Sequence, residues 1–332
     1  MKHTKVIGVG HYLPENIVTN TEISSKIDTT DEWITERTGI KKRHWFNPDK
    51  DTVANMSTRA SKMAIEHAGI NTKEIDFIVF ATITPDYFFP GSGVLLQREL
   101  GLQGIGAIDI RNACSGFIYG LSVADNFIKT GMFKTVLVVG AEIQSSALDK
   151  SSAGRSNNVI FADGAGALIV QATDDPTHSV LSTHLHADGD YAEELYVKDP
   201  GSSRKLRLSS ELIESESVKV HMNGNFVFKH AVVRFEEVIY EALKANGVEK
   251  EDIDLLIPHQ ANLRISQFVQ KRLGLPDEKV FNNIMHVGNT TAASIPIAIS
   301  EALGKGKIKE GDLVCLAAFG SGFTWASALI RW

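Results

Sequence analysis

Arg111-Asn112-Ala113-Cys114-Ser115-Gly116-Phe117-Ile118-Tyr119-Gly120 (residues 111–120) joins a largely apolar run to an amphipathic segment. The preceding residues 105–110 are mostly apolar and bordered by glycines, which predicts a buried strand. Four apolar residues then recur at helical spacing: Ile118, Leu121, Ala124 and Ile128. Gly131 is suited to end that helix. We therefore expect Cys114 to lie where a strand passes into a helix.

Cys114 has two interpretations at such a junction. The free amides and the positive end of the helix favour an anion, so we expect a lowered thiol pKa and a reactive thiolate. The alternative is a buried, inert thiol, which is the commoner state of a lone cysteine. The second cysteine, Cys315, lies in the apolar run 313–318 and reads as a buried strand residue. Two such cysteines form no disulfide framework.

Composition narrows the class of protein. The chain has 332 residues, 43% hydrophobic and 22% charged, which indicates two globular units and excludes disorder and a membrane bundle. No apolar run reaches transmembrane length. At the start of the chain, Gly8 follows too soon for residues 1–8 to contain the apolar segment of a signal peptide. We expect a cytoplasmic protein with no membrane partner. A net charge of −6 argues against binding to nucleic acid.

Two parts of the sequence resemble each other. Residues 64–79 align with residues 242–257 when Gly69 is placed on Gly247, an offset of 178, and both copies read as helix, glycine, acidic turn and strand. A Leu-Gly-Leu triplet recurs at 100–102 and 273–275. The repeat predicts α/β units in which helices cover parallel strands.

The repeat also divides the chain and relates its polar residues. We expect an N-terminal half at 1–173, a loop-rich connection at 174–225 and a C-terminal half at 226–332, with a helix starting near Lys229. An offset of 175 places Asn289 opposite Cys114, so two equivalent junctions are expected to face one site. His259 follows the apolar run 255–258, at the strand edge where α/β sites form.

Cysteine, histidine and asparagine support two reaction classes. In a papain-like hydrolase, His259 acts as the general base and Asn289 orients it. In an acyltransferase, both side chains donate hydrogen bonds to a carbonyl oxygen. The glycine and tryptophan that flank a papain-type cysteine are missing here. The local sequence therefore disfavours the hydrolase.

Four fragments identify a family resemblance: NACSGF with Cys114, PHQAN with His259, GNTTAAS with Asn289, and the ending AAFGSGFTWASALIRW. In order and spacing they resemble β-ketoacyl-acyl-carrier-protein synthase III of the thiolase superfamily, and the resemblance runs from Ile7-Gly8 to Trp332. It implies an α/β, thiolase-like, five-layered αβαβα fold built from two duplicated halves.

The resemblance also implies a reaction. Cys114 takes an acyl group from acyl-CoA, malonyl-acyl carrier protein loses carbon dioxide, and its carbanion attacks the acyl-enzyme to give β-ketoacyl-acyl carrier protein. His259 and Asn289 would hydrogen-bond the enolate, and the backbone amides of Cys114 and Ser321 would form the oxyanion hole. Ser321 departs from the glycine commonest at its position. Acyl-CoA is a substrate, so no cofactor is implied.

Binding residues follow from the same resemblance. Trp33 and Arg155 match the pair that sandwiches the adenine of CoA, and Arg37 matches a phosphate contact. Three further residues match positions beside the pantetheine arm: Gly224, Phe228 and Asn262. Without the family, Trp33 would read as an aromatic residue packed in a core.

Two protein partners are also implied. In the family, a basic surface receives the acidic carrier protein. Four residues of this chain match that surface: Lys229, Arg264, Lys271 and Arg272. Their alternative is an ordinary solvated helix face. Phe89 matches the residue that crosses a homodimer to close the partner's acyl pocket; its alternative is a core aromatic at a loop edge.

Other readings receive less support. His184, His186 and Asp188 alternate along one run, but a zinc site needs a further convergent group, so no metal is expected. Gly91-Ser92-Gly93 differs from the pattern of acetyl-CoA users, which leaves open an enzyme for longer or branched primers in a specialised pathway. A degradative thiolase needs a second catalytic cysteine, and an inactive partner subunit would not need Cys114, His259 and Asn289.

Overall fold

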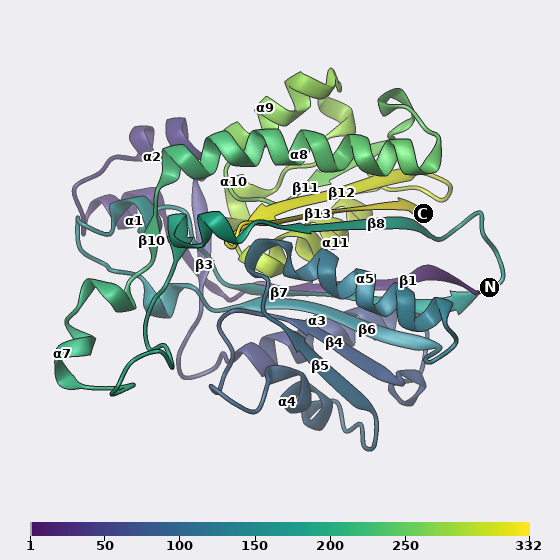
Figure 1. Cartoon of the computed structure of the whole chain (residues 1–332), viewed down its shortest axis with the longest axis horizontal. Helices are drawn as coiled ribbons and strands as arrows, with labels where there is room; N and C mark the ends of the chain where they lie inside the picture. The colour runs from purple at the N-terminus through teal and green to yellow at the C-terminus, as the bar shows by residue number, and fades with distance from the viewer. Residues whose placement is uncertain (1) are drawn as a thin grey trace.

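Two mixed β-sheets form the centre of the computed structural model, which describes residues 2–332 (Figure 1). The first sheet has the order β1 (His3–Tyr12), β7 (Gly164–Thr173), β6 (Thr135–Glu142), β4 (Phe77–Ala81) and β5 (Gly106–Ile110). The second has the order β11 (Leu255–Pro258), β12 (Leu313–Gly320), β13 (Thr324–Arg331) and β8 (Val180–Ala187). The parallel neighbours are β4 with β5 and β6, and β11 with β12; the other pairs are antiparallel.

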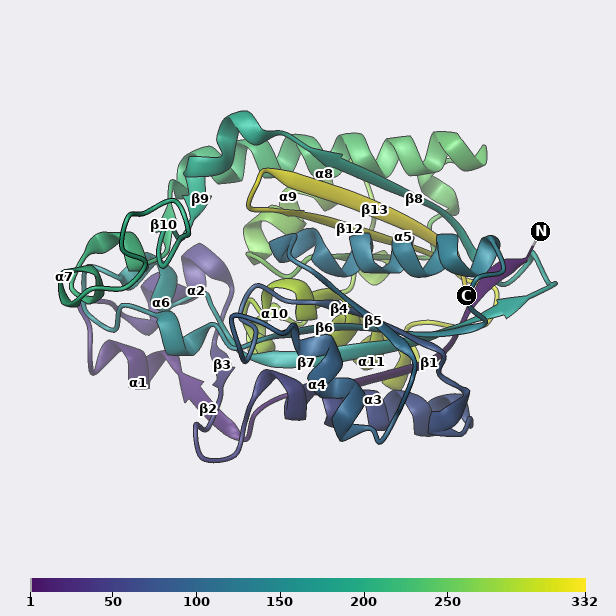
Figure 2. The same ribbon diagram turned by 60° about the horizontal axis from the view of Figure 1, so that its bottom comes forward.

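Helices alternate with these sheets to make five layers (Figures 1 and 2). The outer face of the first sheet is covered by α3 (Val53–Ala68) and α4 (Ser92–Glu99). The central layer holds α5 (Gly116–Lys129) and α11 (Ser294–Gly304). The outer face of the second sheet is covered by α8 (Gly224–Asn246) and α9 (Leu263–Leu273). The expected αβαβα fold is confirmed.

Shorter elements surround one end of the layers. They are β2 (Asn16–Thr19), α1 (Asn20–Ser24), α2 (Asp31–Thr38), β3 (Lys42–Trp45), α6 (Arg155–Asn158), β9 (Leu195–Tyr196), α7 (Ser210–Ile213), β10 (His221–Met222) and α10 (Ile284–Val287). Within residues 2–332, every helix is too short or too polar to cross a membrane.

The duplication is visible element by element. The helices α3 and α8 both end at a left-handed glycine, Gly69 with φ of 66° and Gly247 with φ of 63°. The strands β4 and β11 begin 178 residues apart, as do β6 and β12. Gly101 and Gly274 are also left-handed, with φ of 69° and 68°. The repeat seen in the sequence therefore reflects two copies of one folding unit.

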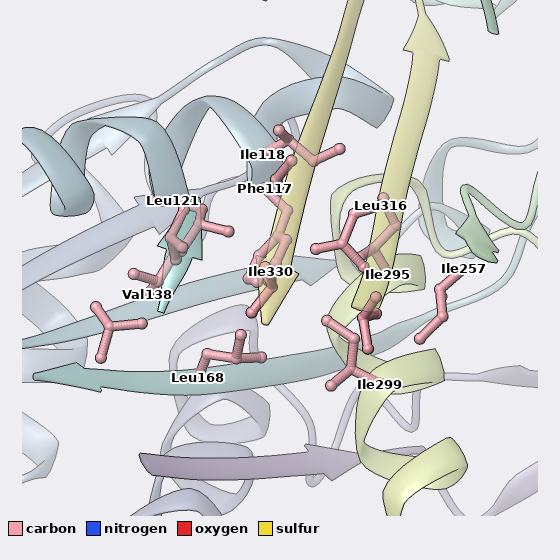
Figure 3. Close-up of a cluster of buried hydrophobic side chains, with 14 of the residues drawn as sticks. Phe117, Ile118, Leu121, Val138, Leu168, Ile257, Ile295, Ile299, Leu316 and Ile330 are labelled. Atoms are coloured by element: carbon pink, nitrogen blue, oxygen red, sulfur yellow. The ribbon is translucent and has the colours of Figure 1, made fainter. Parts of the chain in front are cut away.

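The two central helices are held by apolar side chains from both sheets. Figure 3 shows Phe117, Ile118 and Leu121 of α5 and Ile295 and Ile299 of α11 packed among strand residues. The strand residues are Val138, Leu168, Ile257, Leu316 and Ile330, and all ten side chains are at most 1% exposed. Each such burial contributes about 1.5–3 kcal/mol. These contacts fix where the two helices begin.

Each central helix is preceded by one tight turn, Ala113–Ser115 before α5 and Thr291–Ala293 before α11. Ala113 and Thr291 have φ of 44° and 52°, a left-handed conformation that L-residues rarely adopt. The turns lie 178 residues apart, so the counterpart of Cys114 is Ala292. The expectation that Asn289 is its counterpart is therefore wrong: Asn289 lies in the loop before the second turn. We call these two turns the elbows.

Three other expectations differ from the structure. Residues 105–110 do not form a buried strand, because β5 lies at the sheet edge and Ile108 is 39% exposed. The segment 174–225 is not only a connection, since it supplies β8 to the second sheet. The helix expected near Lys229 begins at Gly224, after the cap residue Asn223.

Candidate functional site

Cys114 lies in the first elbow and is 7% exposed. The corner between β12 and β13 approaches it closely: a Cβ placed on Gly320 would lie 2.7 Å from the Cys114 Cβ and 3.1 Å from its Sγ. Only glycine therefore fits at position 320 without a shift. The C-terminal corner forms one wall around the thiol.

Hydroxyl groups tie this corner to the first elbow. The Oγ of Ser115 lies 2.7 Å from the Oγ1 of Thr324, and the Thr324 hydroxyl donates to the Ser321 carbonyl at 3.0 Å. The Ser321 hydroxyl donates to the carbonyl of Leu195. Among residues 2–332, Ala113 and Thr291 are the only non-glycine residues with positive φ. Ser321 thus replaces glycine without left-handed strain.

The thiol pKa does not follow the expectation. Burial, with a smaller effect from Glu142, raises the pKa of Cys114 from 9.0 to about 12. A helix terminus provides at most about 2 kcal/mol, and one pKa unit corresponds to about 1.4 kcal/mol. The helix effect is therefore too small to bring the pKa below its ordinary value. The resting protein holds a thiol, and desolvation is the reason.

Glu142 is a buried neighbour that sequence reasoning missed. It ends β6 and accepts hydrogen bonds from the Thr84 hydroxyl at 2.6 Å and the Ile83 amide at 3.2 Å. The backbone amide of Ala292 in the second elbow also donates to it. Burial raises the pKa of Glu142 to about 8. The available signal for it in the sequence was a single acidic residue directly after the mainly apolar run 135–141.

His259 follows β11 and is 2% exposed. Its backbone amide donates to the Ala317 carbonyl at 2.8 Å, and its Nδ1 lies 2.6 Å from the Ser294 Oγ. Its buried Nε2 has no hydrogen-bond partner in the part of the chain that the structure describes. Burial lowers the pKa of His259 to about 3, so the imidazole is neutral. A neutral ring with one free nitrogen can hydrogen-bond a substrate.

Asn289 is held just before the second elbow and is 5% exposed. Its backbone amide donates to the Ile160 carbonyl at 3.0 Å. Its Oδ1 accepts from the Thr291 amide at 2.9 Å. An amide N–H can only donate, so this contact identifies the side-chain oxygen and leaves Nδ2 as the free donor.

The elbows bring these residues to one region. The two turns contact each other, and a Cβ on Gly116 would lie 3.8 Å from the Cβ of Ala292. Cys114 belongs to the first elbow, while Asn289 contacts the second and His259 contacts the residue that follows it. A buried thiol and two neutral donors suit acyl transfer through a covalent intermediate, followed by stabilisation of an oxyanion.

Residues expected to bind CoA gather at the surface. The guanidinium carbons of Arg155 and Arg37 lie 4.7 Å and 5.1 Å from the centroid of the Trp33 ring. Asn262 caps α9 and donates to the Arg37 carbonyl at 3.0 Å, which joins α9 to the end of α2. Trp33 is partly exposed, so it is more than a core aromatic.

The other expected CoA contacts lie near the start of α8. A Cβ on Gly224 would meet no atom within 4 Å, so the backbone there is open to a ligand. Phe228 lies one turn further along and packs on Phe268, with ring centroids 6.2 Å apart.

The expected carrier-protein residues are exposed on α8 and α9. Lys229 lies on α8, and Arg264, Lys271 and Arg272 lie on α9. Arg272 pairs with Glu236, with 2.6 Å between its Nη2 and the carboxylate. Its charge is partly matched within the chain, whereas no ion pair within residues 2–332 involves the other three residues.

Phe89 is not a core aromatic. It is 80% exposed, and its neighbours Tyr87 and Phe88 are 53% and 61% exposed. The guanidinium carbon of Arg207 lies 3.3 Å from the Phe88 ring centroid. The loop therefore presents an apolar surface beside a basic residue.

The alternating histidines contact a helix. His184 and His186 lie 3.3 Å and 2.6 Å from the carboxylate of Glu241 on α8. Asp188 instead accepts from the Asp190 amide at 3.1 Å. Among residues 2–332, no group of three or more Asp, Glu, His or Cys side chains is arranged so that it could hold a metal ion.

Comparison with known proteins gives consistent matches. Residues 108–189 match the family model 3-Oxoacyl-[acyl-carrier-protein (ACP)] synthase III, and residues 243–332 match the model of its C-terminal part. A beta-ketoacyl-[acyl-carrier-protein] synthase III of Xanthomonas euvesicatoria pv. vesicatoria is 47% identical, with 99% of this chain and 98% of that protein covered. The crystal structure of the 3-oxoacyl-[acyl-carrier-protein] synthase III of Aquifex aeolicus VF5 has a TM-score of 0.91 and 44% identity, covering 99% of this chain and 100% of that one.

We predict that alkylation of Cys114 by iodoacetamide accelerates about tenfold per pH unit from about pH 7 to about pH 10 without a plateau, because the thiolate fraction keeps rising below the pKa. Peptide mass spectrometry would follow Cys114 separately from the buried Cys315. A plateau reached below about pH 8 would instead support the low pKa first expected from the helix terminus.

Proposed function

Because this chain belongs to the β-ketoacyl-[acyl-carrier-protein] synthase III family, we propose that it condenses an acyl-CoA primer with malonyl-acyl carrier protein, the step that initiates fatty-acid synthesis. The observation that carries this proposal is the neutral, buried His259, whose Nε2 has no partner within residues 2–332, together with the oriented amide of Asn289. The absence of a disulfide between its two free cysteines suits a cytoplasmic location.

Acyl transfer is the first step. The Cys114 sulfur attacks the thioester carbonyl of acyl-CoA, a new C–S bond forms, and the bond to the CoA sulfur breaks. The thiol proton ends on the CoA sulfur, so the step needs no net acid or base, which suits a buried thiol of raised pKa. The amides of Cys114 and Ser321 stabilise the oxyanion. No cofactor is required, because acyl-CoA is itself a substrate.

Decarboxylation and condensation follow. The malonyl thioester loses carbon dioxide, and the electron pair of the broken C–C bond forms an enolate. His259 Nε2 and Asn289 Nδ2 each donate a hydrogen bond to the enolate oxygen, and neither group changes charge. The carbanion then attacks the acyl carbon, a C–C bond forms, and the C–S bond to Cys114 breaks. The Cys114 thiolate takes up one proton from the solvent, which restores the thiol and balances the reaction. Burial strengthens both hydrogen bonds because water does not compete for them.

The acyl pocket is the part of the proposed site that would contact the primer. The stretch 86–95, which we assign to the acyl pocket, is fixed to α3 because the Asp86 carboxylate accepts from the amides of Val53 at 2.8 Å and Ala54 at 3.0 Å. The curated relatives that are 42–47% identical are named beta-ketoacyl-[acyl-carrier-protein] synthase III, which supports initiation of fatty-acid synthesis over the alternative of longer or branched primers in a specialised pathway.

We predict that His259→Ala and Asn289→Ala each slow malonyl decarboxylation by about 2–4 kcal/mol, or about 30- to 900-fold, while Cys114 still accepts the acyl group. The reason is that these donors contact the enolate and not the acyl oxyanion. Intact-protein mass spectrometry after acyl-CoA addition and release of carbon dioxide from malonyl-carrier protein would separate the two steps.

His11→Ala is the matched control, since this partly buried histidine also contacts a serine of α11. Cys114→Ala should form no acyl-enzyme, and Cys114→Gln should retain decarboxylation. Equal loss of both steps in His259→Ala would contradict the division of roles, and full condensation by Cys114→Ala would refute the assignment.

We propose that carrier protein docks on the exposed bases of α8 and α9, of which Lys229, Arg264 and Lys271 have no ion pair within residues 2–332. This surface adjoins the proposed CoA entrance, because Asn262 at the start of α9 contacts Arg37. Positive charges without internal partners attract an acidic protein at long range.

We predict that Arg264→Glu weakens carrier-protein binding about tenfold at low salt and that the difference shrinks at high salt, because screening reduces attraction between exposed charges. Lys62→Glu, an exposed site on α3 in the opposite outer layer, is the control. Binding would be measured by surface plasmon resonance over a salt series. Equal effects of the two variants would argue against this docking surface.

We also propose a homodimer. The strand β5 ends its sheet with one free edge, Ile108 on it is exposed, and the apolar loop containing Phe89 is exposed as well. An uncovered strand edge with apolar side chains favours pairing with another chain. A second copy would cover the edge, and Phe89 would then reach the partner's acyl pocket.

Sedimentation should therefore give twice the chain mass of 36.3 kDa. Ile108→Lys should shift the protein towards the single chain, because a charge would be buried between the paired edges. Met132→Lys, at a site that is also exposed but lies outside β5, should not. A wild-type protein that sediments as one chain at micromolar concentration would refute the dimer.

A further inference from the structure

We infer that Ser294 is a positioning residue that keeps the proton of His259 on Nε2, the nitrogen that faces the substrate. The inference rests on the proposed function, in which Nε2 must donate to the enolate. Two neutral tautomers of the ring exist, and only one of them has a hydrogen on Nε2. The other would present a lone pair to a negative oxygen. Something in the fold must therefore select between them.

The contacts of the Ser294 hydroxyl make that selection. Its Oγ lies 2.6 Å from His259 Nδ1, and the Gln260 amide approaches the same Oγ at 3.4 Å. The amide can only donate, so the serine oxygen accepts from it. The single hydroxyl hydrogen is then free to point at Nδ1. Nδ1 accepts, and the ring proton is left on Nε2.

The opposite tautomer would be poorly satisfied. With a hydrogen on Nδ1, the Ser294 oxygen would accept from both His259 and Gln260, and its own hydrogen would have no acceptor among the contacts formed by residues 2–332. Ser294 is 1% exposed, so bulk water does not reach its hydroxyl group. A buried donor without an acceptor is unfavourable, which disfavours this arrangement.

The neighbouring backbone is fixed by the Gln260 side chain. Its Nε2 donates to the Pro258 carbonyl at 2.7 Å, and its Oε1 accepts from the amides of Asn283 and Ile284 at 3.0 Å and 3.2 Å. These bonds hold the Gln260 amide near Ser294. The hydroxyl orientation therefore follows from rigid parts of the fold.

One turn of chain then orients both donors. The Thr291 amide fixes the Asn289 side chain, and three residues later Ser294 fixes the His259 ring. The second elbow has Ala292 at the position equivalent to Cys114, and it runs directly into the residue that contacts His259. In this copy of the repeat, the turn directs hydrogen-bond donors.

The same helix offers a matched control. Ser300 of α11 is 4% exposed, and its Oγ lies 2.8 Å from the Nδ1 of His11. This is the same pair of atoms in a similar setting, away from the elbow. Removing the Ser294 hydroxyl removes a serine–histidine contact to His259, whereas removing the Ser300 hydroxyl removes a similar contact that does not involve His259.

The experiment compares full-length Ser294→Ala, Ser294→Thr and Ser300→Ala. Ser294→Ala should reduce malonyl decarboxylation about tenfold or more, less than loss of the donor itself, while acylation of Cys114 stays within about twofold. Ser294→Thr keeps a hydroxyl and should recover most of the rate. Ser300→Ala should change neither step.

Nitrogen-15 NMR of labelled imidazole, assigned by loss of the signal in His259→Ala, reads the tautomer directly. The wild type should show hydrogen on Nε2, and Ser294→Ala a mixture of both forms. Hydrogen on Nδ1 in the wild type, or decarboxylation by Ser294→Ala within about twofold of wild type, would overturn the inference. If the wild type lacks decarboxylation, the proposed function fails, while the tautomer signal still tests Ser294.

Discussion

The contact between the two elbows is the constraint on which the rest of the structure depends. Each elbow begins with a residue forced to positive φ, and each starts a central helix packed between the two sheets. Their approach requires small neighbours: a Cβ on Gly140 would overlap the Ala292 carbonyl, and one on Gly320 would press on Cys114. The buried apolar faces of α5 and α11 supply the free energy that maintains these strained turns.

Burial at this contact acts in opposite directions on two titratable groups. It raises the pKa of Cys114 and lowers that of His259, so that both are uncharged. An uncharged pair suits chemistry in which the thiol proton passes to the leaving thiol and the enolate requires donors of fixed orientation. The proposed reaction would thus rely on preorganised hydrogen bonds in a dry environment more than on a permanent thiolate.

Sequence reasoning succeeded where local chemistry determines the structure. The caps Gly69 and Gly247 need a left-handed conformation, so their offset of 178 marked both copies of the repeat and predicted its α/β units; the five layers were implied by the family resemblance. It failed where contacts join distant residues: Glu142 meets Thr84, and Ser294 meets His259, across 58 and 35 positions. It misjudged β5 because an apolar strand has the same pattern whether its own chain or another covers it.

The two halves share one backbone plan but have diverged in what the elbow provides. At equivalent positions one copy has Cys114 and the other Ala292, which has no reactive group. The second elbow is instead flanked by the side chains of Asn289 and His259, which residues 291–294 hold in place. The repeat therefore gives the chain two turns of the same geometry: the first carries Cys114, and the second orients the two side chains that we propose to stabilise the carbanion.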